Sequence, residues 1–168
     1  MSGGRQDGTV VCPGSYDPVT NGHLDIITRT SKVFDRVVVG VVNNPIRKQK
    51  TLFTAEERKA FIEEATADLA NVEVQTFSNL LVEFARELDA TAIVKGLRAI
   101  SDFEYEFEMA QLNRKLDPDM ESIYMIASPQ YSFLSSTGVK EMATFKGDVS
   151  DLVPDSVASA MASRLGER

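Results

Sequence analysis

Hydrophobic residues gather in five short runs that are rich in β-branched side chains. The runs cover residues 9–12, 36–42, 72–77, 92–94 and 122–127. Most of them are almost continuously apolar instead of alternating with polar residues, which is typical of strands that are covered on both faces. The pattern therefore predicts five buried strands.

Between and after these runs, apolar residues recur at helical spacing. Four helices are predicted in this way, over residues 23–34, 54–69, 79–88 and 102–116. Thr54 and Glu57 have the spacing of a capping box, and Ser78 is the candidate cap of the third helix. Pro154 is expected to open one more helix through residues 156–165.

Strands and helices therefore alternate along the chain, and the links are too long for hairpins. This order implies parallel strands joined by crossover connections. We predict an α/β fold, a Rossmann-like doubly wound five-stranded parallel sheet with helices on both faces. At 168 residues the chain is expected to form a single domain over residues 9–168.

The first eight residues are small, polar and rich in glycine, and we expect residues 1–8 to form a disordered N-terminal extension. This stretch lacks the apolar core of a signal peptide, and the chain has no apolar run long enough to span a bilayer. A cytoplasmic protein with no membrane partner is expected.

Charge and cysteine content narrow the function. The formal net charge of −7 argues against a protein that binds nucleic acid or a membrane surface through a broad basic face. A small anionic ligand remains compatible, because a few local cations can override the average. With Cys12 as the single cysteine, no internal disulfide or multi-thiolate metal site is possible. We interpret Cys12 as a buried strand residue.

In a doubly wound sheet, ligands bind beyond the carboxyl ends of the strands. We therefore expect the loops that follow the five runs to converge into an electropositive pocket for phosphate. These loops hold glycine, hydroxyl and cationic residues, namely Gly14, Ser15, Arg47, Lys48, Lys95, Gly96, Arg98, Ser135, Ser136 and Thr137. Taken alone, residues 47–50 are equally consistent with a solvated loop, and residues 135–137 with a helix cap.

His23 is the only histidine of the chain, and it lies where the first helix is expected to begin. The free N–H groups and the positive end of a helix attract phosphate there, and an imidazole can donate to a phosphate oxygen. A purely local capping role is the alternative. No G-x-G-x-x-G follows the first run and no P-loop motif is present, which disfavours a dehydrogenase or a P-loop kinase.

Three motifs carry a family resemblance. The sequence T-N-G-H at residues 20–23 resembles the T/H-x-G-H signature of the nucleotidylyltransferase superfamily, and SSTGVKE at 135–141 resembles its second signature. Together, PGSYDPVTNGH, KGLRAISDFEYE and YSFLSST are similar to the bacterial phosphopantetheine adenylyltransferases, from about residue 9 to the C-terminal helix. The resemblance implies direct in-line transfer of AMP from ATP to 4'-phosphopantetheine, without a covalent intermediate, giving dephospho-coenzyme A and pyrophosphate.

The resemblance also assigns site residues by position. It implies three catalytic residues, His23, Lys95 and Arg98. The implied ATP contacts are Ser15, Tyr16, His23, Gly96, Leu97, Arg98, Glu106, Tyr131, Ser132, Phe133, Leu134, Ser135, Ser136 and Thr137. The implied phosphopantetheine contacts are Ser15, Leu81, Lys95 and either Arg47 or Lys48, since the family usually has lysine where this chain has Arg47.

Further properties follow only from the resemblance. It implies Mg²⁺ held mainly by the substrate phosphates, a homohexamer, and coenzyme A as a feedback ligand. The nearest alternative is another nucleotidylyltransferase, for nicotinamide mononucleotide or a cytidylyl group, which the pairing of KGLR with YSFLSST disfavours. A non-catalytic nucleotide sensor and an interaction scaffold are the alternatives from other classes.

Overall fold

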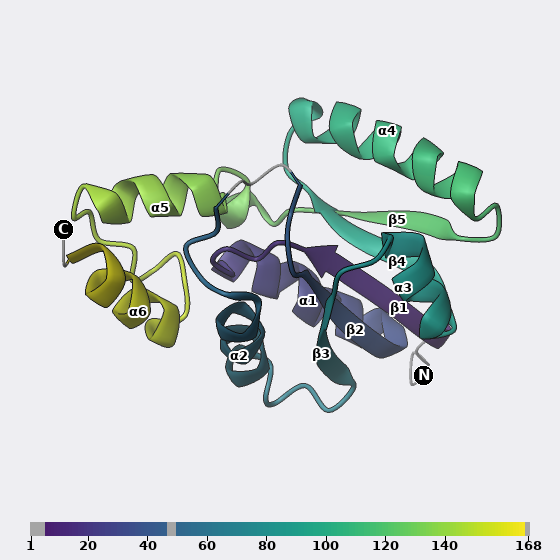
Figure 1. Ribbon diagram of the computed structural model, residues 1–168, viewed down its shortest axis with the longest axis horizontal. Coiled ribbons are helices and arrows are strands. Elements are labelled where there is room, and N and C mark those ends of the chain that lie inside the picture. Colours follow the sequence, from purple (N-terminus) through teal and green to yellow (C-terminus); the bar gives the residue numbers. More distant parts are fainter. Residues whose placement is uncertain (1–5, 47–49, 167–168) are drawn as a thin grey trace.

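A computed structural model describes residues 6–46 and 50–166 of the chain. Its five strands are β1 (Gln6–Gly14), β2 (Phe34–Val42), β3 (Val72–Phe77), β4 (Ala90–Leu97) and β5 (Glu121–Ile126). They form one sheet in the order β3-β2-β1-β4-β5, and every neighbouring pair is parallel (Figure 1). The predicted five-stranded parallel sheet is confirmed.

Three strands are longer than their apolar runs, and one of them is β2, which begins at Phe34 instead of residue 36. β1 begins at Gln6, which pairs with Phe34, so residues 6–8 belong to the sheet and not to the extension expected over 1–8. β4 extends three residues beyond its apolar run, to Leu97, and pairs there with Ile126. Strand pairing uses backbone groups, so a ladder continues past the last buried side chain. Residues 1–5 lie outside the described part.

Six α-helices connect and follow the strands within the described residues. They are α1 (Asn21–Val33), α2 (Ala55–Ala65), α3 (Leu81–Glu87), α4 (Ile100–Leu116), α5 (Ser136–Thr144) and α6 (Asp155–Gly166), and a 3-10 turn, η1, covers Pro129–Tyr131. No helix of the described chain has the length and apolar character needed to cross a membrane.

One of the two predicted caps is correct. The Glu57 amide donates to Thr54 Oγ1 at 3.2 Å and the Thr54 amide donates to Glu57 Oε2 at 2.8 Å, so the capping box of α2 is confirmed. The cap expected from Ser78 is wrong. α3 begins later, its N-cap is Leu80 without a side-chain bond, and Ser78 Oγ accepts a hydrogen bond from the Asn43 amide instead.

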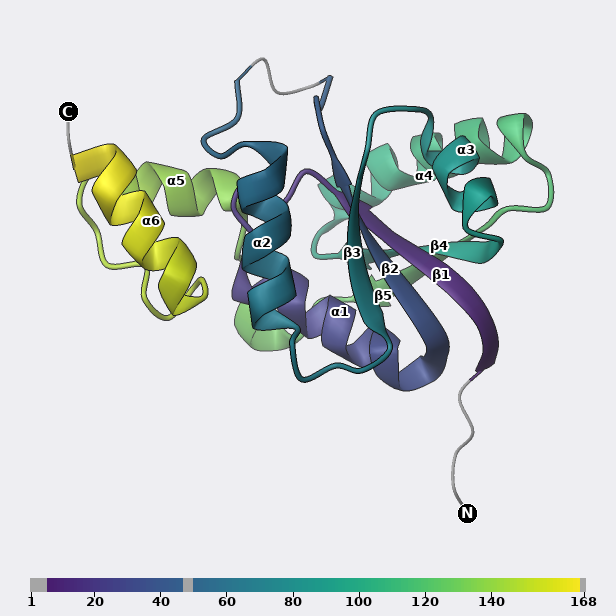
Figure 2. The same cartoon turned by 60° about the horizontal axis from the view of Figure 1, so that its bottom comes forward.

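The sheet is covered on both faces, as its continuous apolar runs predict. Val10 and Cys12 of β1 point into one core with residues of α1, α2, α5 and α6, whereas Val11 points into the other core, beside α3. Alternate strand residues therefore serve opposite faces. Figures 1 and 2 show α5 and α6 packed together at one end of the molecule.

A buried arginine on α2 joins the loops at the carboxyl end of the sheet. Arg58 is 0% exposed, and within the described residues its guanidinium donates to backbone carbonyls alone. The five acceptors lie 2.6–3.2 Å away on the loop after β1, at the end of β2 and just beyond it, and on the segment before α2; they are Ser15, Val42, Asn43, Phe53 and Thr54. Arg58 therefore ties three segments together that are distant in sequence.

Asp17 is the matching buried acid. It is 0% exposed and accepts from the backbone amides of Leu52 and Phe53 at 2.9 Å each, and from Lys140 Nζ of α5 at 3.1 Å. Burial lowers the pKa of Arg58, and the nearby charge of Asp17 opposes that effect. The two residues fix the loop after β1 from both sides.

Replacement of the buried guanidinium tests this role. We expect Arg58→Met to lower the free energy of unfolding by about 3–5 kcal/mol, because it leaves several buried carbonyls without donors and removes the positive charge near the buried Asp17 carboxylate. Urea unfolding measures the loss. Arg114→Met is the matched control, since the ion pair between Arg114 and Glu121 is exposed, and it should cost less than about 1 kcal/mol. Equal losses in the two variants would contradict the role of Arg58.

Candidate active site

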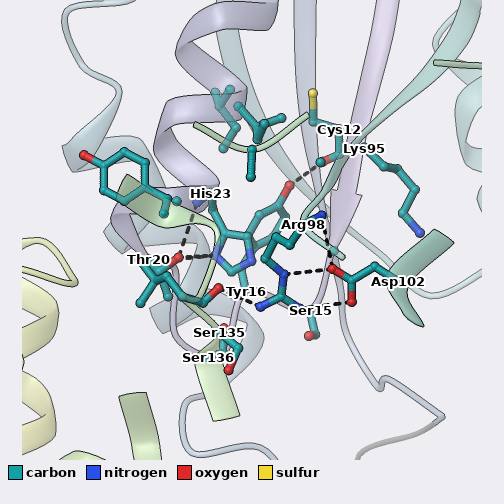
Figure 3. Close-up of a pocket in the computed structure, with 18 of the residues that line it drawn as sticks. Cys12, Ser15, Tyr16, Thr20, His23, Lys95, Arg98, Asp102, Ser135 and Ser136 are labelled. Atoms are coloured by element: carbon teal, nitrogen blue, oxygen red, sulfur yellow. Dashed lines mark hydrogen bonds and ion pairs between the residues drawn. The ribbon is translucent and has the colours of Figure 1, made fainter. Parts of the chain in front are cut away.

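A cavity of about 310 Å³ lies at the carboxyl end of β1 and β4. It is framed by the loop after β1, the start of α1, the end of β4, the first half of α4 and the start of α5 (Figure 3). Twelve of the expected site residues line it: Ser15, Tyr16, His23, Lys95, Gly96, Arg98, Glu106, Tyr131, Leu134, Ser135, Ser136 and Thr137. The loops after β1, β4 and β5 therefore converge as predicted, whereas no described residue of the loops after β2 and β3 lines this cavity.

Four expected residues of the described chain do not line the cavity. Leu97 and Ser132 lie near it in sequence but outside its lining, and Phe133 is 71% exposed on the far side of the same loop. Leu81 begins α3 and packs against the core on the other face of the sheet. Arg47 and Lys48 lie outside the described residues. The substrate contacts of all the expected site residues, those that line the cavity included, stay predictions.

His23 occupies the third position of α1 and completes a capping box with Thr20. Its amide donates to Thr20 Oγ1 at 3.3 Å, and the Thr20 amide donates to His23 Nδ1 at 3.0 Å. Because Nδ1 accepts that hydrogen bond, the neutral ring carries its proton on Nε2. The capping role and a phosphate-donor role therefore use different ring nitrogens, and they are compatible.

The ring of Tyr16 supports His23 from below. The two ring centroids are 5.0 Å apart and the planes meet at 75°, an edge-to-face contact. Gly14 makes room for Tyr16, since a Cβ at position 14 would lie 3.0 Å from the tyrosine ring. Tyr16 has a left-handed backbone with φ of 49°, and its buried hydroxyl donates to the Cys12 carbonyl at 2.9 Å. The loop is shaped to orient the imidazole.

The start of α5 forms the opposite wall. Ser135 is the N-cap, and its Oγ accepts from the Gly138 amide at 3.0 Å, so the helix-cap interpretation of this triplet is correct. Ser136 Oγ donates to the Pro18 carbonyl at 2.8 Å, which joins α5 to the loop after β1. The first residues of α5, Ser136 and Thr137, line the cavity, and the start of a helix suits an anion.

Each lysine or arginine in the cavity has a carboxylate partner on α4. Lys95 Nζ lies 2.6 Å from Glu106 Oε2. The two groups form an ion pair, but their angles do not meet the geometry of a hydrogen bond. Arg98 Nε donates to Asp102 Oδ2 at 3.0 Å. Two positive and two negative side chains therefore line the cavity, and their formal charges cancel. The electropositive pocket expected from the loops is wrong for the described residues, because α4 supplies both acids.

Asp102 is the site residue that the sequence analysis missed. The signal was the i, i+4 spacing of Arg98 and Asp102, which places opposite charges side by side where a helix begins. Such pairs are common on exposed helix surfaces, so the spacing alone does not indicate a cavity.

Known proteins resemble the chain over nearly its whole length. The model of the cytidylyltransferase-like family matches residues 11–142. The phosphopantetheine adenylyltransferase of Alkaliphilus metalliredigens is 52% identical over 154 residues, which covers 92% of this chain and 97% of the relative. That of Rubrobacter xylanophilus is 57% identical over 147 residues, 88% of each chain. The chain belongs to the phosphopantetheine adenylyltransferase family.

The fold of this family member is shared more widely. A crystal structure from Vibrio parahaemolyticus, of a protein provisionally assigned as a nicotinate-nucleotide adenylyltransferase, superimposes with a TM-score of 0.67. The match covers 94% of this chain and 93% of that one at 14% identity. At this identity the likeness establishes the Rossmann-like architecture and nothing about the substrate.

Cys12 also lines the cavity of this family member, where it is 2% exposed. Burial raises the pKa of the Cys12 thiol to about 12, and a hydrogen bond with Thr30 opposes the shift only in part. A thiol with this pKa is protonated at neutral pH and is a poor nucleophile. The structure supports the interpretation of Cys12 as a packing residue.

Alkylation tests that interpretation. At pH 8 about one Cys12 side chain in ten thousand is expected to be ionised, so native protein should resist iodoacetamide for hours. Protein unfolded in guanidinium chloride should be fully labelled under the same conditions, because the thiol regains its ordinary pKa. Mass spectrometry after timed quenching measures both. Rapid labelling of the native protein would show that Cys12 is a reactive thiol.

Proposed function

We propose that the protein transfers AMP from ATP to 4'-phosphopantetheine, producing dephospho-coenzyme A and pyrophosphate. One observation carries the proposal: the histidine of the T-x-G-H motif shares a single cavity with Lys95, Arg98 and the start of α5. The relatives that are 52–57% identical are named for this activity. The reaction belongs to coenzyme A biosynthesis.

The attacking group is a phosphate monoester, which is already ionised at neutral pH, so the site needs no general base. It needs alignment of two polyanions and donors where charge grows on the α-phosphate. His23 Nε2, Arg98 and the first amides of α5 are suited to hold the triphosphate. Lys95 is suited to hold the incoming phosphate, and Ser15, which lines the same cavity, is proposed to contact both substrates.

Other contacts are proposed from family position. Gly96, Leu97, Glu106 and residues 131–134 complete the nucleotide side, and Leu81 contacts the pantetheine arm through its backbone. Arg47 or Lys48 adds a cation on the phosphopantetheine side. Arginine forms a planar fork and lysine a point charge, so the two would hold the phosphate differently.

Mg²⁺ is proposed as the companion of ATP. The described residues contain no group of three His, Cys, Asp or Glu side chains that would hold a metal ion. Magnesium commonly keeps several waters and binds through substrate phosphates, and the hydroxyl-lined cavity accommodates this mode. When bound, the ion neutralises charge on the triphosphate.

Assembly, regulation and location complete the proposal. We propose a homohexamer with coenzyme A as a feedback ligand, in the cytoplasm where ATP is available. Four large side chains of α4 are about half exposed, with exposed fractions of 48–54%, and they are Phe103, Phe107, Leu112 and Leu116. An apolar row of this kind supports burial in a subunit contact.

Pyrophosphate release tests the function directly. With ATP, Mg²⁺ and 4'-phosphopantetheine we expect turnover, and with nicotinamide mononucleotide or a cytidylyl donor we expect none. His23→Ala should lower kcat roughly 10²–10³-fold, because it removes one donor to the transition state. Its thermal unfolding should change little. Near-normal kcat in this variant would refute the role of His23, and ATP binding without turnover in the parent would favour a nucleotide sensor.

Lys95→Ala tests the partition of the cavity between the two substrates. We expect it to weaken the binding of 4'-phosphopantetheine about tenfold or more and that of ATP only slightly, because the lost charge faces the incoming phosphate. Isothermal titration calorimetry with each substrate alone measures both affinities. Lys115→Ala, on the last turn of α4, is a control for the loss of one positive charge. Equal weakening of both substrates would contradict the partition.

A further inference from the structure

Asp102 accepts three hydrogen bonds from Arg98. Its Oδ2 accepts from the Arg98 backbone amide at 3.2 Å and from Nε at 3.0 Å, and its Oδ1 accepts from Nη2 at 3.3 Å. Asp102 is the third residue of α4, where the positive end of a helix favours a carboxylate. Backbone and side chain of Arg98 are therefore held by one acid, as Figure 3 shows for the guanidinium.

The other side of the guanidinium is held by the loop before α5. Arg98 Nη1 donates to the Leu134 carbonyl at 2.6 Å. Of the five N–H groups of an arginine side chain, Nε, Nη1 and Nη2 each give one to the protein, which leaves one on each terminal nitrogen. Such a pair suits two oxygens of one phosphate. The contacts fix the plane of the fork before substrate arrives.

The same carboxylate also lowers the charge of the cavity. Asp102 and Arg98 are both partly buried, with side-chain exposures of 28% and 36%. Their interaction is therefore screened less than at an open surface. A bound triphosphate meets an arginine whose charge is already balanced. Asp102 thus weakens the attraction between Arg98 and any polyphosphate, including the released pyrophosphate.

We propose that Asp102 is a positioning residue for adenylyl transfer that orients Arg98 and, as its counter-charge, limits the affinity of the site for ATP and pyrophosphate. The inference rests on the proposed function. Binding that is equal in the ground state and in the transition state gives no gain in kcat. A residue that weakens ground-state binding while it holds the fork in place favours both turnover and product release.

Asp102→Asn separates this role from a structural one. The amide keeps the size of the side chain, but it removes the charge and replaces one acceptor with a donor. We expect ATP and pyrophosphate to bind about three- to tenfold more tightly, because the charge of Arg98 is no longer balanced. We expect kcat to fall roughly tenfold or more, because the fork is no longer fixed. Calorimetric titration and steady-state pyrophosphate release measure the two changes.

Two further variants serve as controls. Glu121→Gln makes the same change in net charge, but Glu121 begins β5 at the end of the sheet opposite the cavity, in an exposed pair with Arg114. It should leave affinity and kcat unchanged. Asp102→Glu keeps the charge and alters the reach, so the affinities should stay near those of the parent while kcat falls. Thermal unfolding verifies that every variant is folded.

The outcomes are distinct. Tighter polyphosphate binding with lower kcat in Asp102→Asn supports the proposal. Weaker binding together with lower kcat, or a fall in kcat without tighter binding, overturns the counter-charge role, and unchanged kcat overturns the orienting role. If the parent releases no pyrophosphate with 4'-phosphopantetheine, the proposed function fails. The titrations with ATP and pyrophosphate then still decide whether Asp102 is the counter-charge.

Discussion

The site depends on a buried arginine that holds the loop after β1 in place. Within that loop Tyr16 has a left-handed backbone, which costs about 1–3 kcal/mol for a side chain of this kind unless neighbouring contacts enforce it. On one side of Tyr16, Arg58 donates a hydrogen bond to the carbonyl of Ser15. On the other side, Asp17 accepts hydrogen bonds from backbone amides of the segment before α2. The loop is therefore fixed at both ends of the strained residue, and the tyrosine ring stays under His23.

The T-x-G-H motif has a structural explanation in this frame. Thr20 is the N-cap of α1 and His23 its third residue, so their spacing is that of a capping box in which an imidazole replaces the usual acid. One ring nitrogen completes the helix cap, and the other carries the proton of the neutral ring.

The features that the sequence predicted are those with a local physical cause. The bounds of β3 and the capping box of α2 follow from apolar runs and from the spacing of two residues. Arg58 could not be predicted in this way, because one polar residue in an amphipathic helix looks like a surface residue until five carbonyls from distant segments converge on it. The cap predicted from Ser78 was wrong for a related reason. The Ser78 hydroxyl accepts a hydrogen bond from the side-chain amide of Asn43, which is distant in sequence.

An acidic chain can still carry a cavity suited to anions, because the orientation of the hydrogen-bond donors in the cavity does not depend on the net charge of the chain. An arginine that pairs with a carboxylate keeps its planar donor geometry while its long-range field is largely cancelled. A cavity with unpaired cations would attract every polyphosphate, product as strongly as substrate. By placing Asp102 and Glu106 on one helix, the fold directs donors at defined points without an excess of positive charge. Under the proposed function, selectivity among anions rests on the geometry of these donors and of the loop after β1.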